Sequence, residues 1–377
     1  MSSKLLARPH AQSLHAGLLY RTLSQRAPSA QVIHILEVNP THIRIEVNHA
    51  FESGMEREPV NAIAQRVGAV AAINGSNYRR GGTFNGNSVN ILKINSTLIT
   101  DPAIYRAALY WSPGIPARIE QLHTSAQLKI GAYNVPIDRI NQPRAAHEAV
   151  LYTDAFHPTT LTDTLGAEIT IADGHVVSVT PDKGNSPIVP TGLVLSIGPL
   201  HALDVNTLSV GMRAQLHYHS APLTSGNHAK HSLPTFIVGG SGLLIKDGQI
   251  ITDFNDDLLL GNPITHTPDE VVADFHDNTQ RKNLINQRHP RTAVGLRADG
   301  TWVVVVVDGR APKISEGMTF AELAQLMADL GCVDAINMGG GGCSTMYLDG
   351  QIVNTPCGNG TEPSGTPRPV AEAITFF

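Results

Sequence analysis

The sequence contains little cysteine. Its 377 residues include only Cys332, Cys343 and Cys357, and all three lie near the C-terminal end. An odd, small number of cysteines without a dense spacing pattern does not make a disulfide framework. Reduced thiols are therefore favoured, and a single bridge, for instance between Cys343 and Cys357, is the alternative.

An excess of positive charge and long apolar runs are also missing. The chain has 27 Lys and Arg against 32 Asp and Glu, a net charge of −5, which argues against a general nucleic-acid binder because such proteins need a basic face. No apolar run approaches the roughly 18 residues that span a membrane, so no membrane partner is expected. Residues 1–28 lack the continuous apolar segment of a secretory signal, which predicts a cytoplasmic protein unless a signal has been removed.

Glycine and proline, in contrast, are plentiful, with 34 and 24 residues, and indicate many turns between short elements. Trp302–Val307 is an unbroken β-branched and aromatic run that predicts a buried strand. Thr319 and Glu322 have the spacing of a capping box and predict a helix that follows them. Such patterns predict an α+β fold of mixed or antiparallel sheets with a few packed helices, in one large domain over 17–377 after a flexible arm at 1–16.

One stretch, 334–347, stands out because four consecutive glycines follow a short apolar segment. A strand that runs into a glycine turn presents successive backbone N–H groups to a concavity, which suits an anion such as a phosphate. A tight turn chosen for packing is the alternative interpretation. The polar residues around this turn are candidate ligand-binding residues: Asn337, Gly340, Gly341, Gly342, Cys343, Ser344 and Thr345.

Two segments of the chain share one pattern. Residues 68–74 and 331–337 both read Gly-x-Val-x-Ala-Ile-Asn, both follow an amphipathic helix and both lead into glycine-containing sequence. We infer that the two units deliver Asn74 and Asn337 to similar positions at strand ends, lining one pocket. Chance similarity between two buried strands is the alternative. Next to the first unit, Arg79 and Arg80 are either surface charges or a rim for an anion.

The polar middle of the chain raises the question of a metal. His217 and His219 form a His-x-His pair, and His228, His231, Asp253, Asp256, Asp257, Asp269 and Glu270 follow. Their spacing matches no dedicated metal site, so no metal or other cofactor is predicted. The stretch 246–290 is expected to form long loops over the site. Further upstream, Glu148 borders an apolar strand, where burial would make it a candidate acid; an ion pair with Arg144 is the alternative.

Several motifs, taken in order, resemble the phosphodiester glycosidase family. They are 72–75 (Ala-Ile-Asn-Gly), 239–244 (Gly-Gly-Ser-Gly-Leu-Leu), 291–295 (Arg-Thr-Ala-Val-Gly), 307–310 (Val-Asp-Gly-Arg), 315–319 (Ser-Glu-Gly-Met-Thr) and 337–345 around the glycine turn. The resemblance covers roughly residues 17–377, and the ordered set is far more specific than any single motif.

The resemblance implies hydrolysis of a sugar-1-phosphodiester, a small-molecule or glycan substrate, to free sugar and a phosphomonoester, without a cofactor. It assigns stabilisation of the departing phosphate to Arg291, Arg310 and the glycine amides. Asp308 would activate water or orient an arginine, with simple turn formation as the alternative. Asn74 and Gly75 would join the substrate-binding residues.

The glycine loop departs from the family pattern Asn-Leu-Asp-Gly-Gly-Gly-Ser-Ser-Thr. Gly339 stands where the family has Asp, and Cys343 stands where it has the first Ser. If the missing carboxylate takes part in catalysis, the chain is an inactive glycan- or nucleotide-sugar-binding protein. A third hypothesis is an enzyme that uses Cys343 as a nucleophile, although no histidine lies close to it in sequence.

Overall fold

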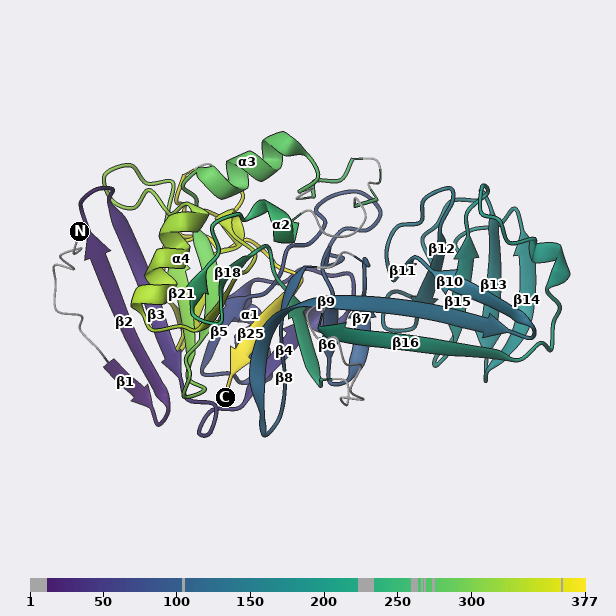
Figure 1. The fold of residues 1–377 in the computed structure, drawn as a ribbon, viewed down its shortest axis with the longest axis horizontal. Coiled ribbons are helices and arrows are strands. Elements are labelled where there is room, and N and C mark those ends of the chain that lie inside the picture. Colours follow the sequence, from purple (N-terminus) through teal and green to yellow (C-terminus); the bar gives the residue numbers. More distant parts are fainter. Residues whose placement is uncertain are drawn as a thin grey trace.

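The computed structural model describes residues 12–103, 106–222, 234–258, 264–265, 267, 269–272, 275–360 and 362–377. Within them the chain forms four sheets in which strands far apart in sequence are neighbours (Figure 1). All strand pairs of these residues are antiparallel except β11 with β12. The predicted combination of mixed or antiparallel sheets and few helices is confirmed, with strands dominating strongly.

The largest sheet has the order β1-β2-β3-β21-β20-β22-β18-β19. Its strands are β1 (Gln12–His15), β2 (Leu18–Gln25), β3 (Gln31–Val38), β18 (Leu243–Lys246), β19 (Gln249–Ile250), β20 (Arg291–Leu296), β21 (Trp302–Val307) and β22 (Asp334–Asn337). The arm predicted at 1–16 is too long, because Gln12–His15 pairs with β2; residues 1–11 lie outside the described residues. The strand predicted at 302–307 is confirmed.

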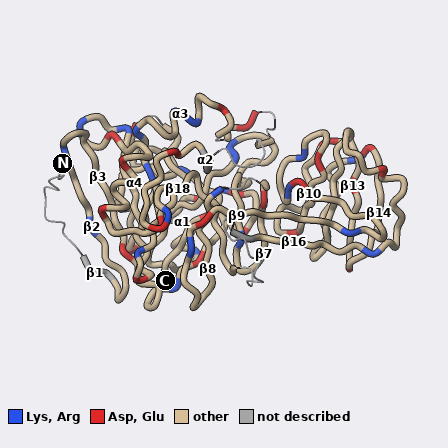
Figure 2. The backbone as a smooth tube through the Cα atoms, in the orientation of Figure 1, with Lys and Arg blue, Asp and Glu red and all other residues tan. Residues whose placement is uncertain are grey.

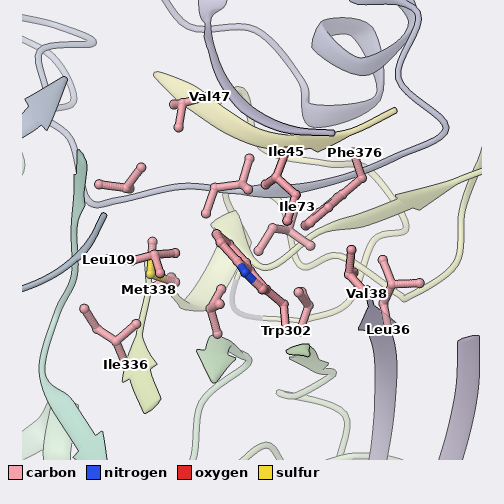
Figure 3. Close-up of a cluster of buried hydrophobic side chains, with 14 of the residues drawn as sticks. Leu36, Val38, Ile45, Val47, Ile73, Leu109, Trp302, Ile336, Met338 and Phe376 are labelled. Carbon is pink, nitrogen blue, oxygen red and sulfur yellow. The ribbon is translucent and has the colours of Figure 1, made fainter. Parts of the chain in front are cut away.

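A five-stranded sheet faces this one. It has the order β24-β23-β5-β25-β4, with β4 (Ile45–His49), β5 (Ala71–Asn74), β23 (Met346–Leu348), β24 (Gln351–Ile352) and β25 (Glu372–Phe376). Between the two sheets, Trp302 packs among Ile45, Ile73 and Phe376 (Figure 3). Burial of such large apolar side chains is the main stabilising term of the fold.

Helices cover the outer faces of both sheets. α4 (Phe320–Asp329) packs on the large sheet, and its capping box of Thr319 and Glu322 forms as predicted. α1 (Val60–Val67) packs on the five-stranded sheet. α2 (Asn255–Leu258) and α3 (Asn278–Asn286) interrupt the stretch that was predicted as loops, 246–290. Short 3₁₀ turns occur at Ala50–Glu52, Val205–Thr207 and Gly341–Cys343. None of the helices in the described part of the chain is long and apolar enough to span a membrane.

A lobe projects from this body (right side of Figure 1). The long strands β9 (Ile115–Ile130) and β16 (Ala214–Pro222) pair with each other and run into it, next to β10 (Tyr133–Ile137). The lobe sheet has the order β11-β12-β15-β13-β14, from β11 (Arg139–Ile140), β12 (Ala149–Thr153), β13 (Ala167–Ala172), β14 (His175–Pro181) and β15 (Leu193–Ile197). At the body end, β9 pairs with β8 (Ala107–Ser112). The same sheet then continues, in order, with β17 (Phe236–Gly239), β6 (Leu92–Ile94) and β7 (Thr97–Thr100). The lobe has its own apolar core.

Charged residues of both signs are scattered over body and lobe (Figure 2). The described residues contain no group of three or more His, Cys, Asp or Glu arranged to hold a metal ion. His217 and His219 lie exposed on β16, whereas His228 and His231 lie outside the described residues, as do the side chains of Asp256 and Asp257.

Candidate functional site

A pocket of about 300 Å³ lies beside the glycine loop that follows β22. Its walls come from residues that are far apart in sequence: the loop after β5, α3 with the turn that follows it, the loop after β21, and the C-terminal loop before β25. The polar side chains that line it are Asn77, Tyr78, Arg80, Gln280, Asn283, His289, Arg291, Arg310, Cys343 and Arg368. The described lining therefore contains four arginines and no carboxylate.

The glycine loop is held tightly by backbone hydrogen bonds. The Gly339 amide donates to Gly75 O at 3.0 Å, and the Gly341 amide donates to Pro290 O at 2.9 Å. Gly341 has φ +64°, a left-handed conformation that favours glycine. Two of the four glycine amides are thus used inside the protein. The amides of Gly340 and Gly342 have no acceptor among the described residues. Of these two glycines, Gly340 lines the pocket, whereas Gly342 is buried beside it.

Arg291 is the deepest of the four arginines. Its side chain is fully buried and stacks on Phe320, and it donates from Nε to Met318 O and from Nη2 to the carbonyls of Leu284 and Gln287. Nη1 is buried without a hydrogen-bond partner, and burial lowers the pKa of Arg291 to about 9. The guanidinium is therefore held in one position in the pocket wall and keeps one donor atom without a partner.

Arg310 and Arg368 flank the glycine loop. Arg310, in a left-handed conformation with φ +61°, donates from Nη1 to Gly360 O at 2.8 Å. Arg368 donates from Nε to Asn359 and from Nη1 to the sulfur of Cys343 at 3.6 Å. Neither arginine forms an ion pair with a carboxylate of the described residues, and both line the pocket.

The two adjacent arginines after β5 lie in different environments. Arg79 is buried and forms an ion pair with Glu270, so it belongs to the interior. Arg80 lines the pocket, and burial together with the charge of Arg368 lowers its pKa. Tyr78, between the glycine loop and Arg80, donates its hydroxyl to Pro369 O at 2.5 Å, and burial raises its pKa far above the ordinary value.

Asp308 was predicted to act on water or to orient an arginine, but the structure turns it away from the pocket. Its Oδ1 accepts from the Thr355 amide at 2.9 Å and from Asn354 at 3.1 Å, and Oδ2 lies 3.4 Å from His34 Nε2. Burial opposes ionisation, but these donors outweigh it and lower the pKa of Asp308. Asp308 therefore anchors the start of the C-terminal loop.

Glu148 also lies outside the pocket. It is buried at the start of the lobe sheet, where it forms an ion pair with Arg139 at 2.9 Å and accepts from the Ala145 amide. The predicted partner, Arg144, instead pairs with Asp163 at 2.7 Å. Glu148 therefore contacts none of the other candidate site residues. Its contacts are those of a structural ion pair.

Asn74 and Asn337 end their strands in similar ways without lining the pocket. Asn74 donates to Gly339 O at 2.6 Å and accepts from Thr292 Oγ1 at 2.8 Å and from the Thr345 amide at 3.2 Å. Asn337 donates to Met338 O, and its Oδ1 is buried without a partner. The Oγ of Ser344 and the Oγ1 of Thr345 are likewise buried and unpartnered. Of these side chains, Asn74 therefore holds the glycine loop, through its hydrogen bond to Gly339.

Gly75 makes room for a buried carboxylate. A Cβ at this position would lie 2.7 Å from Glu372 Oε1, which accepts from the Ser76 amide at 2.6 Å. Complete burial raises the pKa of Glu372 to about 7. All three cysteines are free, as predicted, and only Cys343 is part of the pocket lining.

The sequence interpretation missed Arg368, His289 and Tyr78. Each lies in a loop or turn with no periodic pattern to place it. The sole local signal is the turn chemistry around Arg368, which stands between Pro367 and Pro369. Burial, followed by the charges of Arg291 and Arg310, lowers the pKa of His289 to about 4, so this imidazole is neutral at pH 7.

Known proteins share parts of this sequence and its fold. A stretch of 92 residues, 24% of this chain and 13% of the relative, is 40% identical to the uncharacterised SPbeta prophage-derived protein YomE of Bacillus subtilis (strain 168). The uncharacterised protein RC0079 of Rickettsia conorii (strain ATCC VR-613 / Malish 7) is 25% identical over 249 residues, 65% of this chain and 77% of the relative.

Among solved structures, a hypothetical protein from Synechocystis superposes with a TM-score of 0.77 at 18% identity, over 98% of this chain and 64% of that one. At this identity the match establishes a shared fold. The sequence model of the phosphodiester glycosidase family matches residues 165–377, more than half of the chain, which include the glycine loop and three of the four pocket arginines. The chain therefore belongs to the phosphodiester glycosidase family.

Proposed function

We propose that the protein hydrolyses the glycosidic bond of a sugar-1-phosphodiester and releases a free sugar and a phosphomonoester. The single observation that carries the proposal is the pocket lining: four arginines, and no carboxylate among its described residues, beside a glycine loop. Such a lining attracts an anion, and the pocket volume of about 300 Å³ suits a small ligand.

The charge change of the reaction explains why arginines are useful here. A phosphodiester carries one negative charge, and the departing phosphomonoester gains a second as the bond between the sugar C1 and the oxygen breaks. The guanidinium groups therefore bind the transition state more strongly than the substrate, which is the condition for accelerating the step. The Nη1 of Arg291, which has no hydrogen-bond partner, and the amide of Gly340, which lines the pocket, would supply donors for the new charge.

Proton transfer is less demanding than in ordinary glycosides. A phosphate leaves readily without protonation, so the pair of carboxylates that most glycosidases use is not required. His289 lines the pocket and is neutral at pH 7 because its pKa is lowered to about 4. It is the lining residue suited to accept a hydrogen bond from the attacking water.

A binding protein without turnover is the second candidate function. It is favoured by the same absence of a carboxylate from the described lining and by Gly339, which stands where the family has Asp. A Cβ at position 339 would lie 2.7 Å from Ser76 O, so the loop of this chain is built for glycine there. A binder would keep affinity for sugar-1-phosphodiesters and release no sugar.

The test is hydrolysis of a panel of sugar-1-phosphodiesters in water enriched in ¹⁸O. Wild type is compared with Arg310→Ala and with Arg118→Ala, whose arginine is exposed on β9 and is not part of the pocket lining. Release of free sugar together with a phosphomonoester that carries no label supports cleavage at the sugar carbon. We expect Arg310→Ala to lower turnover about 10²–10³-fold and Arg118→Ala to leave it unchanged.

Label in the phosphate product would mean cleavage of the phosphorus–oxygen bond, and the protein would be a phosphodiesterase of another kind. Binding of the panel without any release of sugar or phosphate would support the inactive binder instead.

A further inference from the structure

The four pocket arginines can be sorted into two pairs by the groups that each of them approaches. The first pair, Arg291 and Arg310, lies around His289, since both charges act on that imidazole. A Cβ placed on Gly341 would lie 3.1 Å from Arg310 Nη2, so this pair borders the loop at Gly341.

The second pair, Arg80 and Arg368, lies around Cys343. Arg368 donates to the Cys343 sulfur at 3.6 Å, and after burial the charge of Arg368 is the largest influence that lowers the pKa of Arg80. Arg368 also sits directly against Gly342. Arg57, whose Nε is buried without a partner, adds a further positive charge on the same side.

Within the described part of the chain, no carboxylate offsets the charge of either pair. None of the four arginines forms an ion pair with a carboxylate of the described residues, and two of them, Arg291 and Arg368, are buried. Like charges held together in a partly buried site repel one another. One phosphodiester brings a single negative charge, and even its phosphomonoester product brings only two, against the four positive charges of the lining.

We propose that the pocket has two anion subsites and that its substrate carries a second phosphate group close to the reacting phosphodiester. The inference rests on the proposed function, because it takes the reacting phosphodiester to occupy one subsite. The other subsite holds the second phosphate, and Gly340, whose amide has no acceptor among the described residues, lines the same pocket. Diphosphate-linked sugars and phosphodiesters with a second phosphate on a short linker share this chemistry.

Binding of inorganic and simple organic probes tests the proposal without any need for turnover. Calorimetry at constant ionic strength compares orthophosphate, pyrophosphate and propane-1,3-diyl bisphosphate on wild type, Arg368→Gln and Arg118→Gln. We expect at least one of the two double phosphates to bind wild type about tenfold or more tightly than orthophosphate. Arg368→Gln should remove this advantage while retaining orthophosphate binding, and Arg118→Gln should not change it.

The preferred double phosphate identifies the source: pyrophosphate indicates a diphosphate link, and the propane compound indicates a spaced second phosphate. Equal affinity for all three probes, or no binding of any, would overturn the two-subsite proposal. If Arg368→Gln does not fold, as judged by circular dichroism, Arg80→Gln replaces it, because Arg80 makes no side-chain hydrogen bond within the described residues. A failure of sugar release with intact preference for double phosphates would refute the proposed function alone.

Discussion

The side-chain amide of Asn74 donates to the carbonyl of Gly339 at 2.6 Å. Asn74, the residue that ends β5, thereby holds the loop that follows β22. A second hydrogen bond joins the same two segments, because the Gly339 amide donates to Gly75 O. The two Gly-x-Val-x-Ala-Ile-Asn units are joined to each other directly beneath the glycine loop. Their joint role is to position that loop, since neither asparagine lines the pocket.

Replacement of Asn74 by Asp should destabilise the fold. The variant keeps the acceptor for Thr292 and the Thr345 amide but places a carboxylate oxygen against Gly339 O. We expect the free energy of unfolding to fall by about 1–3 kcal/mol, because a buried donor is lost and two acceptors face each other. Urea denaturation measures it, and a change below the error of that measurement would show that the link is dispensable.

Gly339→Asp should lower stability and should not increase turnover. Any Cβ at this position approaches Ser76 O at 2.7 Å and Gly75 O at 3.0 Å, which are backbone atoms that move only with the loop. The expected loss is about 1–3 kcal/mol. Gly340→Ala is the matched control, because its Cβ would lie 3.2 Å from Pro290 O and its backbone is extended. A Gly339→Asp protein that is stable and faster than wild type would contradict this reading of the loop.

Arg291→Met should cost stability even though it adds no volume to the interior. Three carbonyls, those of Leu284, Gln287 and Met318, lose their donor in a buried site. Unsatisfied buried acceptors of this kind are expected to lower the free energy of unfolding by about 2–4 kcal/mol. Chemical denaturation checks the value, with Arg118→Met as the exposed control. A neutral result would mean that water replaces the guanidinium.

Cys343→Ser should retain turnover within a few-fold, because the thiol serves here as pocket lining beside Tyr78 and Arg368. Alkylation of wild type at Cys343 should nevertheless block the pocket, and phosphate should protect against it. Steady-state rates before and after iodoacetamide treatment measure both effects. Complete loss of turnover in the serine variant, with the fold intact, would favour a cysteine nucleophile instead.

The protonation of Glu372 should make stability depend on pH. Its pKa is raised by burial from 4.5 to about 7, so the folded state binds the proton more tightly than the unfolded state. Its contribution is fully present below about pH 4.5 and is lost as the pH rises through about 7. Glu372→Gln should remove this loss, so its stability relative to wild type should rise over this range by about 3 kcal/mol.

The comparison must be made between the two proteins at each pH. His49 and His289, whose pKa values burial lowers to about 4, give wild type and variant alike the opposite slope between about pH 4 and 6.5. Thermal or urea unfolding at several pH values supplies the difference. A difference that does not change with pH would mean that Glu372 ionises normally in the folded protein.

Local chemistry in the sequence determined much of the fold. Pattern and spacing predict features that depend on neighbours within a few residues. Examples are the β-branched run of β21, the capping box of α4, and the glycine that follows each of the two helices and begins a Gly-x-Val-x-Ala-Ile-Asn unit. The same local signals identified the glycine loop, and Arg291 and Arg310 followed from the family's motifs.

Tertiary structure alone decided which charged residues meet in the pocket. Arg80 and Arg368 approach each other because the loop after β5 and the loop before β25 converge on the five-stranded sheet, a long-range pairing that no local pattern encodes. In the sequence Asp308 is a candidate to activate water or orient an arginine, and Glu148 is a candidate acid. In the structure both carboxylates lie in the interior and are hydrogen-bonded or ion-paired to neighbouring donors. Burial and hydrogen-bond partners set the role of a charged side chain, and both depend on contacts made only when distant strands are brought together.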